Sequence, residues 1–115
     1  MPNFNKGEVW FVGFPLEEDN SQIINRPVIV LDENNLGVLS VKVTKHEVRN
    51  DDPYDTPILF WEKANLRFAS TARVSKVMRL QPDDFIFLIG DLHPDDLKKI
   101  EDAYITYMNN NETAT

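Results

Sequence analysis

The chain has 115 residues, 42% of them hydrophobic, which is enough for one domain core and too few for two. It contains no cysteine, so disulfide bonds and thiolate metal sites are excluded. No apolar stretch approaches the roughly 20 residues that cross a bilayer, and the N-terminus lacks the pattern of a signal peptide. We therefore expect a cytoplasmic protein with no membrane partner.

The formal net charge of −7 argues against nucleic-acid binding, which normally needs a basic surface. The charge is unevenly distributed, however. Residues 1–41 carry two basic and six acidic side chains, residues 42–79 carry eight and five, and residues 80–115 carry two and eight. The acids of the last third can simply solvate a helix and a tail, and a basic surface from the middle third can exist beside an acidic one.

Short stretches rich in valine, isoleucine and aromatic residues indicate a protein made mainly of β-strands. The predicted strands cover residues 8–14, 28–31, 36–44, 68–80 and 85–89. Residues 36–44 alternate between apolar and polar side chains, as half-buried strands do. Polar segments over residues 16–25 and 46–57 are expected to form long loops. Several short strands in this arrangement predict a barrel or a strongly curved sheet.

Two helices are expected. Pro57 is suited to open a short helical insertion, because Ile58, Trp61 and Ala64 have helical spacing. Pro94 is suited to open a longer C-terminal helix, whose apolar face consists of Leu97, Ile100, Tyr104 and Met108. We expect a single domain over residues 1–108 and a flexible polar tail over residues 109–115.

Arg26 is the first candidate for a site residue. It directly precedes Pro27, which favours extended backbone and presents the guanidinium at the entrance of a strand, where it can grip a phosphate. A surface ion pair with Glu17, Glu18 or Asp19 explains the same residue.

Thr44 is the second candidate. It ends a predicted strand and leads into Lys45, His46, Glu47 and Arg49, which are residue types that bind phosphate and transfer protons. Such a cluster is also typical of a solvated loop.

Polar residues of the segment 68–80 form a third group. Thr71, Arg73 and Ser75 share one face of the predicted strand, beside Ser70 and Lys76. They can equally be the polar face of a sheet. No glycine-rich phosphate loop, metal-ligand spacing or nucleophile elbow occurs. From the residues alone, the chain is a β-rich domain with two charged loops.

Five segments in order resemble the motifs of the MazF/PemK (Kid) family over about residues 7–106. The segments are GEVWFVGF, NRPVIVL, LSVKVTKHEVR, WEKANLRFASTARVSKVMRL and IGDLHPDDLKKIEDA. They are similar to the family's G-[DE]-V-W-x-V-D-F opening, its R-P-V-V-V strand, a strand ending in threonine, a serine/threonine-arginine strand, and a terminal helix after I-G-x-L.

The resemblance implies a fold, a partner and an activity. The fold is an SH3-like curved β-barrel that forms homodimers, and the protein is the toxin of a type II toxin-antitoxin system, with a cognate antitoxin as partner. The activity is cleavage of single-stranded RNA without a metal or other cofactor. In that reaction the 2′-hydroxyl attacks its own phosphodiester and leaves a 2′,3′-cyclic phosphate and a 5′-hydroxyl.

By the same resemblance, three residues act on the scissile phosphate. Arg26 clamps its oxygens, Thr44 hydrogen-bonds it or orients the nucleophile, and Arg73 stabilises the phosphorane or the leaving group. The other residues expected to bind the substrate are Lys45, Arg49, Ser70, Thr71, Ser75 and Lys76.

Three departures from the family motifs concern the chemistry. Gly13 replaces an aspartate of the opening motif, Ser21 replaces a loop glutamate of the MazF branch, and Ser75 replaces the aspartate that is the proposed base of the Kid branch. Serine has no comparable basicity. His46 is the candidate substitute, because imidazole is a common general acid and base near neutral pH, although a loop histidine can also be a bystander.

The departures leave other functions open. The chain can be a degenerate toxin that binds RNA and antitoxin without cleaving, or a relative of the CcdB gyrase inhibitors. A structural accessory protein of a phage or plasmid is a third alternative.

Overall fold

The structure, a computed structural model, describes residues 3–15 and 23–113. Their strands are β1 (Glu8–Pro15), β2 (Ile23–Asn34), β3 (Gly37–Thr44), β4 (Asp55–Ile58), β5 (Ser70–Leu80) and β6 (Phe85–Asp91). A 3-10 helix, η1 (Pro82–Asp84), precedes β6, and the C-terminal helix is α1 (Pro94–Thr113). Ser21 and the three acids considered as partners of Arg26 lie outside the described residues.

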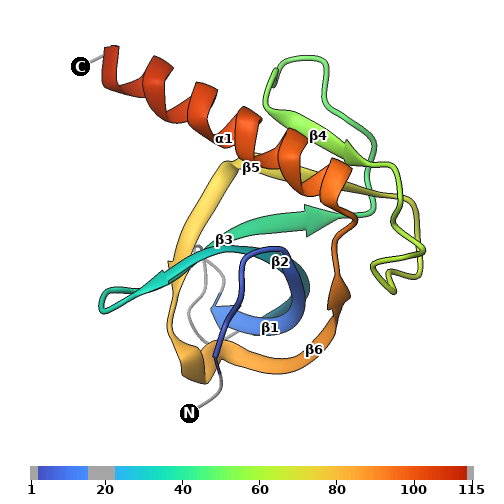
Figure 1. Ribbon diagram of the computed structural model, residues 1–115, viewed down its shortest axis with the longest axis vertical. Helices are drawn as coiled ribbons and strands as arrows, with labels where there is room; N and C mark the ends of the chain where they lie inside the picture. Colours follow the sequence, from blue (N-terminus) through green and yellow to red (C-terminus); the bar gives the residue numbers. More distant parts are fainter. Residues whose placement is uncertain (1–2, 16–22, 114–115) are drawn as a thin grey trace.

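The strands form one antiparallel sheet in the order β4-β5-β3-β2-β1-β6. The sheet curls strongly, and α1 lies across one end of it, beside β4 and β5 (Figure 1). The predicted mainly-β fold with one C-terminal helix is therefore confirmed. In the described part of the chain, β4 and β6 end the strand order and do not pair with each other.

The core occupies both faces of the sheet. On one face, Val9, Ile29, Val41 and Val74 pack with Ile100 of α1, and all five are fully buried. The other face carries smaller clusters, around Phe4 and Val30 and around Val12 and Val28. As a result, β3 is buried on both faces, whereas its alternating pattern predicts burial on one.

The pairing of β3 with β5 is interrupted by a large bulge. Val41 lies opposite Val77, but Lys42 lies opposite Arg73, so residues 74–76 of β5 have no partner in β3. A bulge of this kind bends the strand and re-aims its side chains. It lies where β5 leaves the α1 end of the sheet, and it includes Ser75.

The short helix expected to begin at Pro57 is not found. Pro57 lies inside β4, opposite Thr71 of β5, and β4 is an edge strand, where a missing N–H is tolerated. Residues 59–65 form successive turns, with bonds such as that from the N–H of Leu66 to the carbonyl of Trp61. Strand pairing with β5 and these turns take the place of the helix that the spacing predicted.

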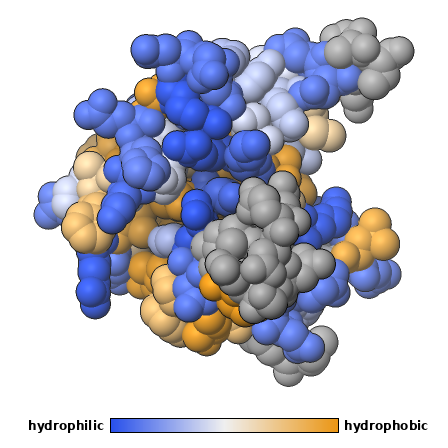
Figure 2. All heavy atoms as spheres, turned by 180° about the vertical axis from the view of Figure 1, so that it is seen from behind, coloured by the Kyte–Doolittle hydropathy of each residue, from blue (hydrophilic) through white to orange (hydrophobic). Residues whose placement is uncertain are grey.

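The C-terminal helix begins at Pro94, as predicted, and runs to Thr113. In the space-filling view from behind, the upper part of the molecule, where α1 lies in Figure 1, is largely hydrophilic, and hydrophobic patches lie lower down (Figure 2). Among the residues that the structure describes, no helix combines the length and apolar character needed to cross a bilayer. The domain boundary at residue 108 stays a prediction.

Candidate functional site

A cavity of about 720 Å³ opens beside the paired ends of β2 and β3. Five of the ten predicted site residues line it, namely Arg26, Thr44, Lys45, His46 and Ser70. They come from β2, from the end of β3 with the loop that follows, and from the start of β5. The remaining walls are formed by β1, by β6 and by residues 65–68.

Arg26 and Thr44 reach the cavity because they lie at the same end of two paired strands. Val28 of β2 is opposite Lys42 of β3. Arg26 and Thr44 each lie two residues from this pair, toward the end of the two strands where the cavity opens. Thr44 Oγ1 accepts a hydrogen bond from the backbone N–H of His46 at 3.3 Å, which leaves its own O–H as a donor. Together Arg26 and Thr44 can offer a guanidinium and a hydroxyl to one phosphate.

Aromatic rings form much of the apolar wall. The rings of Phe11 in β1 and Phe87 in β6 are stacked, with their centroids 5.0 Å apart. Phe87 is 52% exposed, and Phe68, which also lines the cavity, is 59% exposed. Exposed aromatic rings beside cations are the means by which proteins bind single-stranded nucleic acid, because bases can stack on them.

The charged residues of the cavity are all basic. Arg26, Lys45 and Arg67 line it together with His46, and no aspartate or glutamate is among the described lining residues. The Lys45 ammonium lies 5.6 Å from the centroid of the Phe68 ring, within the range of a cation–π contact. The acidic chain therefore contains a locally positive site, in agreement with the excess of basic residues over residues 42–79.

The wall over residues 65–68 is held close to β6. Asn65 has a left-handed backbone (φ 63°), which asparagine tolerates, and its side-chain amide donates to the carbonyl of Ile89 at 3.0 Å. A Cβ at Gly90 would lie 2.6 Å from the carbonyl oxygen of Ala64. Only glycine permits this close approach of β6 to the turn at Ala64.

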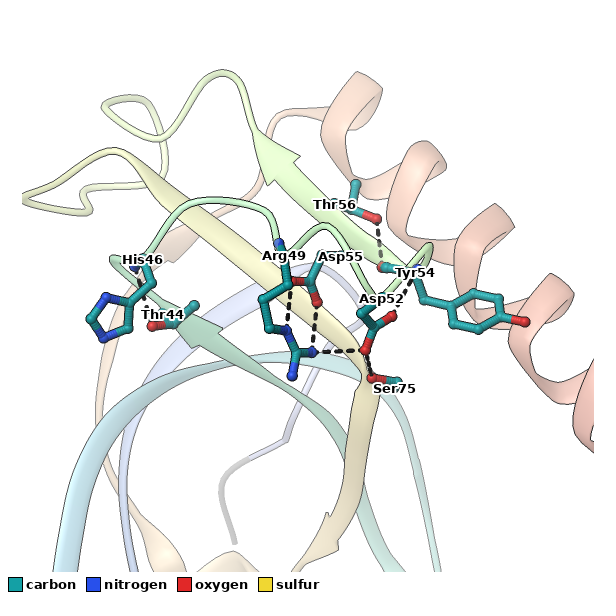
Figure 3. A network of polar contacts seen from close by, with 8 residues as sticks. All are labelled: Thr44, His46, Arg49, Asp52, Tyr54, Asp55, Thr56 and Ser75. Atoms are coloured by element: carbon teal, nitrogen blue, oxygen red, sulfur yellow. Dashed lines mark hydrogen bonds and ion pairs between the residues drawn. The ribbon is translucent and has the colours of Figure 1, made fainter.

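A second polar group, the Arg49 cluster, consists of Arg49, Asp52, Asp55 and Ser75 (Figure 3). Arg49 donates through Nε to Asp55 Oδ2 and through Nη2 to Asp55 Oδ1, both at 2.9 Å, and Nη2 also donates to Asp52 Oδ2 at 2.8 Å. The Ser75 hydroxyl donates to the same Asp52 oxygen at 2.5 Å. The hydrogen bond between Arg49 and Asp55 raises the pKa of Arg49 and lowers the pKa of Asp55.

Arg73 lies between the cavity and the Arg49 cluster in the sheet. It is opposite Lys42 of β3 on one side and Asp55 of β4 on the other. Its Nε is buried and has no hydrogen-bond partner among the described residues. Buried donors are nearly always satisfied. Because the Arg73 side chain as a whole is only half-buried, its guanidinium is a candidate to bind an acceptor from outside the protein.

The structure brings together only some of the predicted site residues. Arg49 and Ser75 belong to the Arg49 cluster, Thr71 is buried opposite Thr44, and Lys76 is exposed in the bulge of β5. The sequence analysis missed the cavity residues Phe11, Asn25, Arg67, Phe68 and Phe87 and the acids Asp52 and Asp55. The acids lie in the charged loop that was noticed, but only the fold shows which of them meets β5. Within the described ranges, no group of three or more histidines and carboxylates could hold a metal ion.

Comparison with known proteins agrees with this architecture. The model of a family described as the PemK-like, MazF-like toxin of type II toxin-antitoxin systems matches residues 5–107. A solved mycobacterial endoribonuclease in complex with its cognate antitoxin is similar in fold, with a TM-score of 0.66 and 16% identity, over 94% of this chain and 96% of that one. Another mycobacterial endoribonuclease structure has the same TM-score and coverage at 15% identity.

No curated protein sequence matches the chain significantly. The two solved structures are too distant in sequence to show more than the fold. The family model, in contrast, covers most of the chain. The chain therefore belongs to the PemK-like, MazF-like toxin family of type II toxin-antitoxin systems.

Proposed function

We propose that this toxin is an endoribonuclease that cleaves single-stranded RNA by attack of a 2′-hydroxyl on the adjacent phosphodiester. The observation that carries the proposal is the cavity, in which Arg26, Lys45 and Arg67 lie beside exposed aromatic rings with no acid among the described lining residues. Cations bind the backbone of a single strand, and the rings stack its bases. The two similar solved structures are described as endoribonucleases, which supports the same activity here.

The chemistry assigns a task to each basic or hydroxyl group near the phosphate. Arg26 holds the non-bridging oxygens through its planar guanidinium, and the hydroxyl of Thr44 orients the phosphate or the nucleophile. Arg73 stabilises the charge that builds up on the phosphorane, because an arginine stays protonated throughout. Lys45 and Ser70 bind the neighbouring backbone, and Arg49 holds its two carboxylates in place.

The test is incubation of the purified protein with a sequence-diverse RNA library in EDTA, followed by mapping of the new ends. We expect 2′,3′-cyclic phosphate and 5′-hydroxyl ends, and no cleavage where a 2′-deoxynucleotide precedes the scissile bond. Arg26→Ala should lower turnover by about 10²-fold or more. Arg79→Ala removes an exposed arginine of β5 outside the cavity and should leave turnover unchanged. Failure of the unaltered protein to cut any RNA in the library contradicts the proposal.

The proposed partner is a cognate antitoxin. One similar solved structure is described as a complex of an endoribonuclease with its cognate antitoxin. A disordered acidic segment would be attracted to the positive cavity and would block RNA. Co-expression with the product of an adjoining reading frame should give a stable complex. In this complex the antitoxin should cover Arg26 and prevent RNA from binding.

We further propose an SH3-like barrel that forms a homodimer, located in the cytoplasm. Ile86 is 55% exposed on the edge strand β6 and does not line the cavity, and an uncovered apolar edge of this kind favours association. Sedimentation at micromolar concentration should show twice the mass of the chain. No observation favours a gyrase inhibitor or an inactive binding module.

A further inference from the structure

Asp52 is held against β5 by three donors. Its Oδ2 accepts from Arg49 Nη2 at 2.8 Å and from the Ser75 hydroxyl at 2.5 Å, and its Oδ1 accepts from the backbone N–H of Tyr54 at 2.9 Å. A carboxylate has about four acceptor positions, so one position on Oδ1 is left over. The side chain is 15% exposed, which leaves a path to a ligand. Asp52 is thus a fixed carboxylate with room for one more proton.

Asp55 belongs to the same cluster but is less suited than Asp52 to accept a proton from a ligand. It accepts two hydrogen bonds from the Arg49 guanidinium and one from the Arg49 backbone N–H, and its side chain is fully buried. The hydrogen bond with Arg49 lowers the pKa of Asp55. Asp55 has as many donors as Asp52, but a carboxylate that no ligand can reach and that is less basic than usual is a poor proton acceptor.

His46 lies in a less favourable position. It is exposed at the mouth of the cavity, and in the described part of the chain its imidazole makes no hydrogen bond or ion pair. A general base acts efficiently when a third group orients it toward the nucleophile. Asp52 has such orienting groups, and His46 has none among the described residues.

Arg73 provides the second, independent observation. Its buried Nε lacks a hydrogen-bond partner in the described residues, and it lies opposite Asp55, which shares the Arg49 guanidinium with Asp52. Arg73 and Ser75 are two positions apart on β5, so even across the bulge their Cα atoms are separated by at most about 7 Å. An oxyanion bound at Arg73 therefore lies within one nucleotide's reach of Asp52.

We propose that Asp52 is the general base of the cleavage reaction and that Arg73 holds the phosphate on which it acts. This inference rests on the proposed ribonuclease function. Asp52 takes the proton of the ribose 2′-hydroxyl, directly or through the Ser75 hydroxyl, as the 2′-oxygen bonds to phosphorus. The bond between phosphorus and the 5′-oxygen then breaks, and the departing 5′-oxygen takes a proton from water. Asp52 afterwards returns its proton to solvent, so no oxidant, metal or other reactant is needed.

The decisive variants are Asp52→Asn and the double variant D52N/S75D, assayed by steady-state kinetics on an oligoribonucleotide that the unaltered protein cleaves. Loss of the base should lower kcat by about 10²- to 10⁴-fold while KM changes little. Because Ser75 Oγ already lies beside the carboxylate of Asp52, an aspartate at position 75 places its oxygens in the same region. The double variant should therefore recover at least about tenfold of the lost kcat.

The controls separate catalysis from folding and from charge. Asp51→Asn removes one negative charge from the neighbouring exposed residue of the same loop and should leave kcat unchanged. Thermal unfolding shows whether each variant is folded, and recovery in D52N/S75D cannot come from an unfolded protein. His46→Ala should keep most of the kcat.

Three results would overturn the inference while the proposed function stands. They are an unchanged kcat in folded D52N, a loss of kcat in H46A that D52N does not share, and a folded double variant without recovery. If the unaltered protein cleaves no RNA, the proposed function fails and the inference fails with it.

Discussion

The carboxylate of Asp96, in the first turn of α1, accepts the backbone N–H of Phe60 at 2.8 Å and that of Leu59 at 3.0 Å. Asp96 is buried, with 1% of its surface exposed, so these two bonds replace its hydration. They tie α1 to the turns that follow β4 and that lead into residues 65–68. One wall of the cavity is therefore anchored to a helix residue that lies 36 to 37 positions further along the sequence.

Asp96→Ala should lower the free energy of unfolding by about 2–4 kcal/mol, because two partly buried backbone N–H groups lose a charged acceptor. Asp95→Ala is the matched control, since Asp95 occupies the same turn of α1 but is exposed to solvent. Urea denaturation of both variants provides the measurement. Equal losses in the two variants would show that the helix charge, and not the anchoring of residues 59–60, is responsible.

Because Arg49 and Asp55 form an ion pair, we expect the free energy of unfolding to fall at acidic pH. The hydrogen bond with Arg49 lowers the pKa of Asp55 in the folded protein below its ordinary value of 3.8. A lowered folded pKa gives stability that is fully present above the unfolded pKa and is lost as the pH falls through the folded pKa. Asp55→Asn should therefore destabilise the protein at neutral pH, and the difference from the unaltered protein should shrink below about pH 4.

Denaturation curves recorded between neutral pH and pH 3 test this expectation. Asp32→Asn, which changes an exposed aspartate of β2, serves as the control for the loss of one negative charge. A difference for D55N that grows toward low pH would contradict the sign of the pKa shift.

The elements with strong local patterns were predicted because their signals lie within a few residues. Ile100 is fully buried on the predicted face of α1, and Pro94 begins the helix as its ring favours. β4 was missed because it has only four residues, one of them a proline, and is defined by its pairing with β5. Pairing with a strand that is distant in the sequence produces no recognisable pattern of apolar residues in a segment of four residues.

The candidate site was predictable only in part, for the same reason. Arg26 and Thr44 could be identified because they match motifs at the ends of strands, and the sheet brings them to one cavity. The contact between Asp52 and Ser75 spans 23 residues and depends on the course of a loop and on the bulge in β5. The sequence shows that a serine occupies position 75, where the Kid branch has an aspartate. It does not show that the loop before β4 places the carboxylate of Asp52 beside this serine.

Phe68 should contribute to RNA binding through stacking. Its ring is exposed beside Lys45, so Phe68→Ala should weaken binding by about 1–3 kcal/mol per stacked base and change stability little. Ile105→Ala is the control, because Ile105 is similarly exposed on α1 but does not line the cavity. Fluorescence anisotropy with an oligonucleotide carrying a 2′-deoxy group at the scissile position measures binding without cleavage. If both variants weaken RNA binding equally, the bases do not stack on the ring of Phe68.

Arg67 should contribute a contact to the RNA backbone, because it is an exposed cation on the wall of the cavity. A contact of this kind releases counterions, so Arg67→Ala should reduce the slope of log affinity against log salt by about 0.7. Lys98→Ala removes a cation of α1 that is paired with Asp102 outside the cavity, and its slope should match that of the unaltered protein. Titrations of the same uncleavable oligonucleotide at several salt concentrations measure the slopes. If R67A keeps the full slope, the RNA backbone does not pass residues 65–68, and the path across the cavity must instead follow Arg26 and Lys45.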